Sequence, residues 1–406
     1  MNIIFHHRTR GLGAEGVHIT GIFDAFKELD HNPTMLSFPG ANPDIDAADS
    51  PSKAQIKSSG FNPLKKAANF TRKLPQALFE LCEIGYNLIA IPRLARTAKE
   101  QACDLVYERY SMFMLAGVIL KKLTGVKVII EVNDSALVHR VRPLKLKRTA
   151  RMIEKYVFNN VDGIVFISNY FRDLAAKEYG EQIMLKSCVS PNGVNLKHFQ
   201  PEKDVREKIK QEIGLCNKTV IGYVGAFVHW HGIDWFVKEI APQLKNNPDI
   251  VLLLVGDGVA YDDIEQCAKN EKVESQVILT GRLPHKKVAR YIQAMDVGIL
   301  PDSNMYGSPM KLFEFMAMGV GMLAPNFSPI TEVVTDNHTG WLFEANDHQA
   351  CIKRVLELSS DKEALAIIGN NAREYIIRER QWKHNASMIF SLLDKDDMSN
   401  LSEQEV

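Results

Sequence analysis

A chain of 406 residues is too long for one hydrophobic core and suits two domains of about 200 residues each. Its apolar share of 46% and charged share of 24% are typical of a soluble globular protein, and its longest apolar run, residues 112–120, is far too short to span a membrane. The six cysteines lie singly and no signal peptide opens the chain, which argues against a disulfide framework or a zinc site and predicts a cytoplasmic protein.

The formal net charge is zero, but the two halves of the chain differ. Residues 1–190 hold 26 Lys and Arg against 19 Asp and Glu, a balance of +7, and the remaining residues have a balance of −7. The excess is concentrated in residues 51–155, where 20 cations face 8 acids. This asymmetry predicts an anionic partner for the first half.

The first predicted strand, residues 2–6, runs into Gly11-Leu-Gly13-Ala-Glu-Gly16 and then into an amphipathic helix. A G-x-G-x-x-G sequence between a strand and a helix is typical of a dinucleotide site, which also needs an acidic residue at the end of the second strand. The second strand, residues 34–38, ends in Pro39-Gly40 without a carboxylate. A nicotinamide enzyme is therefore the weaker interpretation.

The first half continues after a polar stretch at 41–75 that we expect to be a loop or a loosely held amphipathic element. Polar residues follow two of its strands, as Tyr107-Glu-Arg-Tyr-Ser111 and as Glu131-Val-Asn-Asp134. The carboxyl ends of parallel strands are where open sheets bind ligands, although Asn-Asp alone is more typical of a turn. The predicted elements are helices over 74–100 and 112–123 and strands over 105–107, 126–132 and 163–167.

A basic run follows on a predicted helical stretch, residues 143–156. Such a run is usually a solvated helix face, and its functional interpretation is contact with an acceptor or with an anionic membrane surface. The run lacks interleaved aromatic residues and the chain lacks a nucleic-acid module, so no nucleic-acid partner is predicted. Its cations are Lys145, Lys147, Arg148, Arg151 and Lys155.

The second half alternates strands and helices, which predicts another parallel sheet. It opens after a turn-rich joint, Ser190-Pro-Asn-Gly-Val-Asn-Leu-Lys-His-Phe-Gln-Pro201. The predicted strands cover 220–224, 250–255, 277–280, 297–300, 321–325 and 340–343, and the predicted helices cover 262–270, 285–295, 328–334, 346–358, 361–378 and 382–393.

One stretch of the second half, residues 306–319, has the composition of an anion site. Gly-Ser-Pro leads into good helix formers from Met310 to Met318, and Gly319 ends the run. The amides of Met310, Lys311 and Leu312 then point out of a helix N-terminus beside a cation. Glu314, one turn on, can accept hydrogen bonds from hydroxyls, so the pattern suits a nucleotide. The plainer interpretation is a core helix with a solvated Lys and Glu.

These residues resemble the donor site of group 1 (family 4) retaining glycosyltransferases, in which a Glu-x7-Glu element precedes a Met-Ala-x-Gly turn. Glu314 matches the second Glu, which holds the ribose of the nucleotide sugar in that family, whereas the first Glu falls on Tyr306. A main-chain carbonyl, Asp302 or Asn304 is left to hold the donor sugar. The joint at 190–201 is also similar to the crossover of that family.

The resemblance implies roles for residues elsewhere in the chain. It implies that Gly13 lines the cleft and that Asn133 stands where many members carry His. Gly225 opens the loop that neutralises the diphosphate, but Phe227 and His231 replace its usual cations, which leaves Lys311 as the main charge. The implied catalytic residues are Glu314, Lys311 and Asn133, and the implied donor-binding residues are Gly13, Gly225, His231, Arg282, Ser308, Pro309, Met310, Lys311, Leu312 and Glu314.

The implied fold is α/β GT-B, with two Rossmann-like, doubly wound parallel-sheet domains facing across a cleft. We expect an acceptor-binding domain over residues 1–196 and a nucleotide-sugar-binding domain over 197–380. A helix over 381–393 would cross back to the first domain, and residues 394–406 would form a polar, disordered tail.

The sequence thus predicts a glycosyltransferase that moves a sugar from a nucleotide sugar to a hydroxyl of a glycan or lipid-linked acceptor with retention, in cell-surface polysaccharide or lipopolysaccharide synthesis. Two Asp-x-Asp triplets, at 44–46 and 394–396, lie outside the second-domain strands, so we expect no metal and no cofactor. The basic first domain suggests peripheral contact with the inner membrane face. A sugar-nucleotide 2-epimerase on the same scaffold and a non-catalytic nucleotide-binding protein stay open as alternatives.

Overall fold

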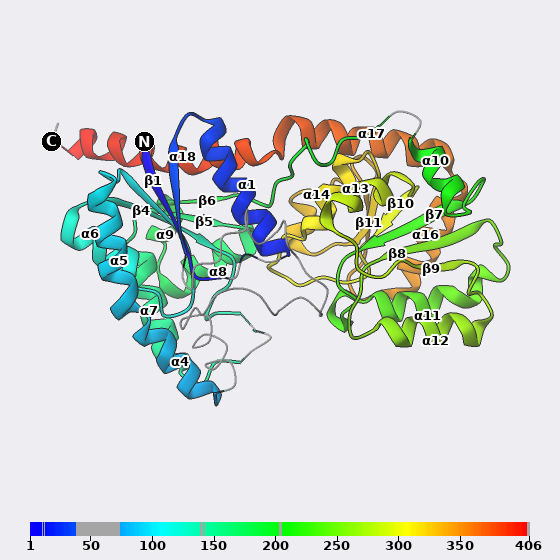
Figure 1. The fold of residues 1–406 in the computed structure, drawn as a ribbon, viewed down its shortest axis with the longest axis horizontal. Coiled ribbons are helices and arrows are strands. Elements are labelled where there is room, and N and C mark those ends of the chain that lie inside the picture. Colours follow the sequence, from blue (N-terminus) through cyan, green and yellow to red (C-terminus); the bar gives the residue numbers. More distant parts are fainter. Residues whose placement is uncertain are drawn as a thin grey trace, which may run out of the picture. The chain divides into compact units, whose positions relative to one another are not determined.

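The computed structural model describes residues 1–9, 11, 13–37, 74–138, 140, 143–202 and 205–403, with only the backbone described for Lys286 and residues 394–403. The chain forms two compact units, which Figure 1 colours by sequence position. Unit 1 contains Met1–Pro191 and Trp382–Val406, and unit 2 contains Asn192–Gln381. The chain thus passes into unit 2 after Pro191, where the sequence predicts a boundary after residue 196.

Unit 1 is built on a six-stranded sheet with the order β2-β1-β3-β4-β5-β6, in which every described strand pair is parallel. The inner strands β3 and β4 are buried on both faces, as expected for a parallel sheet that is covered by helices on both sides. The strands are β1 (Asn2–His7), β2 (Asn32–Ser37), β3 (Leu105–Arg109), β4 (Lys127–Val132), β5 (Gly163–Phe166) and β6 (Ser187–Val189). The helices are α1 (Ala14–Glu28), α4 (Gln76–Gly85), α5 (Asn87–Glu100), α6 (Ala116–Thr124), α7 (Lys147–Asn160), α8 (Asn169–Tyr179), α9 (Gln182–Leu185) and α18 (Trp382–Glu403).

The single helix that the sequence predicts over 74–100 is two helices, α4 and α5, with Tyr86 between them. The buried Asn87 begins α5, and its side-chain amide donates to the carbonyls of Ile84, at 2.9 Å, and Phe113, at 2.8 Å. Its side-chain oxygen accepts from the amide of Leu115 at 2.7 Å. A side chain that bonds backbone groups in this way competes with the helical ladder, and these distant partners could not be read from the local sequence.

Unit 2 contains a second six-stranded sheet, with the order β12-β11-β10-β7-β8-β9 and parallel pairing throughout its described ladders. Its two faces are covered by two separate clusters of buried apolar side chains. The strands are β7 (Thr219–Val224), β8 (Ile250–Val255), β9 (Val277–Leu279), β10 (Val297–Ile299), β11 (Met322–Pro325) and β12 (Trp341–Phe343). The helices are α10 (Val205–Glu212), η1 (His229–His231), α11 (Ile233–Leu244), α12 (Tyr261–Glu271), α13 (His285–Gln293), α14 (Met310–Ala317), α15 (Ser328–Thr331), α16 (His348–Ser360) and α17 (Lys362–Glu379).

The terminal helix α18 belongs to unit 1 and lies along α1 (Figure 1). It buries Trp382, Ala386, Ile389 and Leu392, and the Trp382 indole fills the space where a side chain on Gly21 of α1 would stand. The sequence predicts that this helix ends at residue 393, whereas α18 continues to Glu403. Residues 394–403 contain no Gly or Pro that would stop it.

Among the described residues, no helix has both the length and the apolar character that a transmembrane segment requires.

Candidate functional site

The helix α14 begins at Met310, as the sequence predicts, because Pro309 before it adopts an extended conformation with φ −74° and ψ 117°. It ends one residue earlier than predicted, and Gly319 beyond it takes a left-handed φ of 71°. In the first turn, the amide of Leu312 already donates to the Pro309 carbonyl at 3.1 Å. The amides of Met310 and Lys311 precede the first intrahelical bonds and stay available for an anion.

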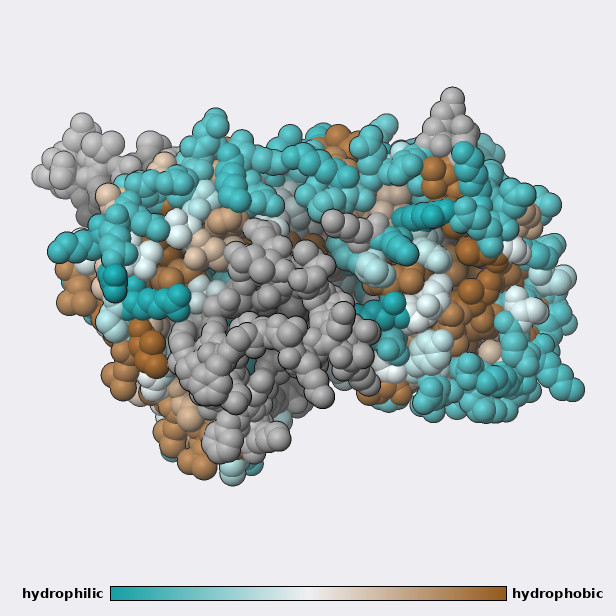
Figure 2. Space-filling view, in the orientation of Figure 1, coloured by the Kyte–Doolittle hydropathy of each residue, from teal (hydrophilic) through white to brown (hydrophobic). Residues whose placement is uncertain are grey.

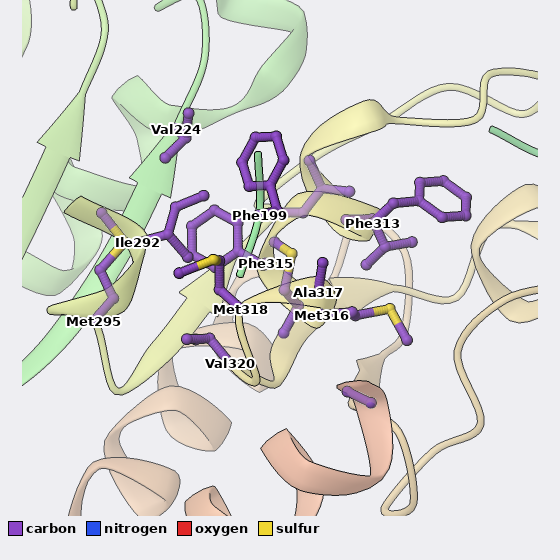
Figure 3. Close-up of a cluster of buried hydrophobic side chains, with 14 of the residues drawn as sticks. Phe199, Val224, Ile292, Met295, Phe313, Phe315, Met316, Ala317, Met318 and Val320 are labelled. Atoms are coloured by element: carbon purple, nitrogen blue, oxygen red, sulfur yellow. The ribbon is translucent and has the colours of Figure 1, made fainter. Parts of the chain in front are cut away.

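The body of α14 is anchored in the core of unit 2. Figure 3 shows Phe313, Phe315 and Met316 of this helix among side chains of other elements, including Phe199 and Ile292. All three α14 side chains are fully buried. Their packing fixes the helix, so the positions of its two polar residues, Lys311 and Glu314, are also fixed.

Lys311 is buried although it carries an amine. Its Nζ donates to the hydroxyl oxygen of Tyr223 at 2.9 Å and lies 4.2 Å from the centre of that ring. None of the ion pairs found among the described residues includes Lys311. Burial lowers the pKa of the Lys311 ammonium from 10.5 to about 7, and the opposing effect of Glu314 does not offset it.

A glycine makes room for this amine. Gly225 follows β7 with a φ of 143°, and a Cβ at this position would stand 2.9 Å from the Nζ of Lys311. Any other residue would therefore be strained and would also press on the amine. Gly225 and Lys311, both predicted to bind the donor, are therefore neighbours in the fold, and their contact with a diphosphate remains a prediction.

His231 joins the same cluster from the other side of Tyr223. Its Nδ1 lies 3.1 Å from the Tyr223 hydroxyl, and both groups reach the carbonyl of Ala226, at 3.1 Å and 3.0 Å. Burial, and then the charge of Lys311, lowers the pKa of His231 to about 4. His231 is thus neutral at physiological pH and does not add a positive charge to the site.

Glu314 is buried one turn beyond Lys311 and has a partner that the sequence did not indicate. Its Oε1 lies 3.0 Å from Nε2 of His285, the first residue of α13. The His285 side chain is 41% exposed, and its hydrogen bond to Glu314 raises its pKa above the ordinary 6.5 despite partial burial. A ribose that binds Glu314 must share the carboxylate with this imidazole or displace it.

The loop before α14 is held by its own polar side chains. Ser308 is buried, and its hydroxyl and carbonyl accept from the backbone and side-chain amides of Asn192 at 3.0 Å and 2.5 Å. Asn304 accepts from the amides of Tyr306, at 3.1 Å, and Gly307, at 2.5 Å. Ser308 is therefore positioned by Asn192, a residue that the sequence marked only as part of the joint.

The remaining predicted residues of unit 2 are Asp302 and Arg282. Asp302 accepts from the amide of Ser303 at 2.7 Å, and partial burial raises the pKa of its carboxyl group. Arg282 is exposed after Gly281, whose carbonyl accepts from the amide of Gly256 at 3.1 Å. Arg282 is thus open to solvent on a loop tied to the end of β8, and its predicted contact with a nucleobase remains a prediction.

Gly13 and Asn133 lie in unit 1. Gly13 precedes α1 with a left-handed φ of 64°. Asn133 follows β4, and its side-chain amide donates to Glu131. Glu131 is buried and also contacts His18 at 2.6 Å, Arg109 at 3.2 Å and the Tyr107 hydroxyl at 2.7 Å. Asn133 is therefore part of a closed polar network at the end of the strands.

This network controls the charge of Glu131. Burial alone would raise the pKa of its carboxyl group. The charges of His18 and Arg109 and the hydrogen bonds from His18 and Asn133 outweigh burial and hold the pKa well below its ordinary value of 4.5. Glu131 is thus a carboxylate with several partners of its own.

Among the described residues, no group of three or more His, Cys, Asp or Glu side chains is placed to hold a metal ion. The first Asp-x-Asp triplet, 44–46, lies outside the described residues. The second, 394–396, lies in α18, and its side chains are outside them too. Metal independence stays a prediction.

Two parallel-sheet units with flanking helices define the GT-B class of α/β proteins, and solved structures share this architecture. HepE of Anabaena in complex with UDP superimposes with a TM-score of 0.72 at 16% identity, over 97% of this chain and 100% of that one. Sucrose-phosphate synthase of Thermosynechococcus elongatus gives 0.71 at 18% identity, over 98% of this chain and 100% of that one. At these identities the likeness shows the fold.

Family models match both halves of the chain. Residues 16–198 match Glycosyltransferase Family 4, and residues 205–375 match Glycosyl transferases group 1. The chain belongs to this family of glycosyltransferases.

Two curated relatives show how distant the characterised members are. The chain is 24% identical to the GDP-mannose-dependent alpha-(1-6)-phosphatidylinositol monomannoside mannosyltransferase of Mycolicibacterium smegmatis, over 60% of this chain and 65% of that protein. It is 25% identical to the UDP-Gal:alpha-D-GlcNAc-diphosphoundecaprenol alpha-1,3-galactosyltransferase of Escherichia coli, over 70% of this chain and 73% of that protein. The match to the first relative thus spans slightly under two thirds of its length.

Proposed function

We propose that this chain transfers a sugar from a nucleotide-sugar donor to a hydroxyl group of a glycan or lipid-linked acceptor, with retention of the anomeric configuration. The observation that carries the proposal is Lys311, a buried amine with no ion pair among the described residues, at the start of α14 and beside Gly225. A diphosphate at this place would meet the amine and the amides of Met310 and Lys311 together. The two relatives named above use GDP and UDP donors.

The proposed mechanism relies on positioning and charge stabilisation. The bond between the anomeric carbon and the diphosphate oxygen breaks, and the bond to the acceptor oxygen forms on the same face. The acceptor proton passes to the leaving diphosphate, so no protein nucleophile takes part. The first-turn amides, the α14 dipole and Lys311 would oppose the charge that develops on the diphosphate, and we propose that no metal is required.

Glu314 would hold the ribose hydroxyls and so orient the donor. The test compares Glu314→Gln with Glu357→Gln, a change on the exposed face of α16, in a donor-turnover assay with UDP-, GDP- and ADP-sugars and an acceptor extract. We expect Glu314→Gln to lose at least about 100-fold in turnover, because it replaces charge-assisted hydrogen bonds by neutral ones. Native turnover by a folded Glu314→Gln protein would refute the assignment.

A donor-only incubation identifies an epimerase, which would convert the sugar nucleotide without an acceptor.

We further propose that unit 1 contacts an anionic membrane at the inner face of the cell membrane, where a lipid-linked acceptor would lie. The buried Glu80 of α4 accepts from the amides of Lys145 and Leu146, at 2.8 Å and 2.6 Å, which ties α4 to the start of the basic helix α7. Figure 2 shows hydrophobic residues gathered at the lower left, over α4 and α5. The exposed apolar side chains there are Leu78, Leu81, Leu88 and Ile89, and Met152 is exposed on α7.

Apolar side chains beside exposed cations suit a surface of anionic lipid. We expect the protein to sediment with vesicles that contain phosphatidylglycerol at low salt, and a Leu88→Gln/Ile89→Gln variant to lose most of this binding. Ile367→Gln, at an apolar position in unit 2 that is as exposed as Ile89, is the control. Equal sedimentation of both variants, or none of the native protein, would refute membrane contact through this surface.

A further inference from the structure

The groups that face the Lys311 amine are all neutral or occupied. Tyr223 of β7 offers a hydroxyl and a ring, and His231 of η1, behind the hydroxyl, is uncharged at physiological pH. Glu314 lies one turn along α14 itself, where its carboxylate contacts His285 of α13. Within the described residues of unit 2, the amine therefore has hydrogen-bonding and ring contacts but no carboxylate in contact with it.

Burying an ammonium in such surroundings costs free energy, because burial removes the water around the charge and no opposite charge replaces it. The amine can avoid this cost by releasing its proton, and burial lowers its pKa to about 7, so that the neutral amine competes with the ammonium near neutral pH. A diphosphate bound beside Gly225 would provide the missing negative charge, and the ammonium would then be the favoured form.

We propose that binding of the nucleotide diphosphate brings a proton from solvent to the Nζ of Lys311, and that Tyr223 positions the amine for this step. This inference rests on the proposed function. The proton adds to the amine lone pair, and the resulting ammonium donates to the Tyr223 oxygen on one side and to the phosphate on the other. The Tyr223 hydroxyl then donates its own proton to the Ala226 carbonyl, 3.0 Å away.

The coupling predicts a specific dependence of affinity on pH. Only the protonated fraction of Lys311 binds well, and this fraction falls roughly tenfold with each pH unit above its pKa. The apparent Kd should thus rise about 50-fold between pH 7 and pH 9. A cation that is already fully charged before binding would give no such rise.

The test is isothermal titration calorimetry with UDP, GDP and ADP at pH 8.0, in two buffers that differ in ionisation enthalpy. The terminal phosphate, with a pKa of about 6, is already ionised there and exchanges little. We expect a net uptake that approaches one proton for each nucleotide bound, because the pKa of the free Lys311 amine lies below this pH. A His285→Gln variant measured alongside removes any proton that the imidazole gives up when Glu314 takes the ribose.

Lys311→Arg is the decisive variant because a guanidinium stays charged at every pH used. It should bind nucleotide with no proton uptake and with an affinity that is flat from pH 7 to pH 9. Tyr223→Phe should keep proton uptake but weaken binding, because the amine loses the oxygen that orients it. Binding by the native protein without proton uptake would overturn the inference and leave the proposed function intact. Failure of the native protein to bind any of the three nucleotides would overturn both.

Discussion

Each unit buries an ionisable side chain near the carboxyl end of its sheet, and the two side chains have opposite surroundings. In unit 1, Glu131 is enclosed by His18, Arg109, Tyr107 and Asn133, which supply positive charge and donors from four directions. In unit 2, the Lys311 amine contacts only the hydroxyl and the ring of Tyr223 among the described contacts. A polar network in which every charge has a partner stabilises the fold. A buried amine without a counter-charge is instead suited to bind an anionic ligand.

The largest expected effect on stability tests the closed network. Glu131→Gln should lower the free energy of unfolding by about 3–5 kcal/mol, because it leaves the buried His18 and Arg109 without their counter-charge. Urea denaturation measures the loss, and Glu178→Gln, on the exposed surface of α8, should stay within about 0.5 kcal/mol of the native protein. Since the pKa of Glu131 is depressed, its contribution should be present above pH 4.5 and decline as the pH falls below that value. Equal free energies of unfolding for Glu131→Gln and Glu178→Gln would show that Glu131 does not stabilise the fold in this way.

The second effect should fall on binding and not on stability. Lys311→Met keeps most of the unbranched side chain and removes the amine, so nucleotide affinity should fall at least roughly 30-fold. The unliganded protein should be as stable as before or more so, because no counter-charge is lost. The native protein should also gain stability between pH 7 and pH 10.5, where the unfolded amine holds a proton that the folded one has released. The variant should lack this gain, and Lys353→Met on the surface of α16 is the control.

The smallest effect concerns the pair of His285 and Glu314. His285 is partly exposed, so the pair should contribute no more than about 0.2–1 kcal/mol to stability. Its pKa is raised by the partner, so this contribution is full below pH 6.5 and is lost as the pH rises through the higher value in the folded protein. His285→Gln should therefore differ from the native protein in thermal denaturation at pH 6 and match it at pH 9. A difference that persisted at pH 9 would mean that packing, and not charge, explains it.

The fold was largely predictable because its signals are local. β8 has the predicted bounds, since an unbroken run from Ile250 to Val255 ends at glycine, and α14 starts where Pro309 sets the backbone. The break between α4 and α5 was not predictable, because Asn87 reaches partners 26 and 28 residues away in the sequence.

The same distinction applies to the site. Lys311 and Glu314 could be named because both lie on one helix and match one motif. Tyr223 is 88 residues from Lys311 and His285 is 29 residues from Glu314, and neither pair has a spacing that a sequence pattern would mark. In the sequence, Tyr223 is one more apolar residue of a buried strand. Its role comes from the position of β7 beside the start of α14, which exists only in the folded chain.

The place of α18 in unit 1 has a consequence for biosynthesis. During synthesis, residues 1–191 are made before the helix α18 that packs against α1, and all of residues 192–381 must be translated before Trp382 can pack at Gly21. The unit that begins first is thus completed last, while the other is one continuous segment that can fold in the interval. A gene fragment coding for 192–381 is accordingly the better choice for separate expression, and one that stops at 191 should yield an incomplete, chaperone-dependent product.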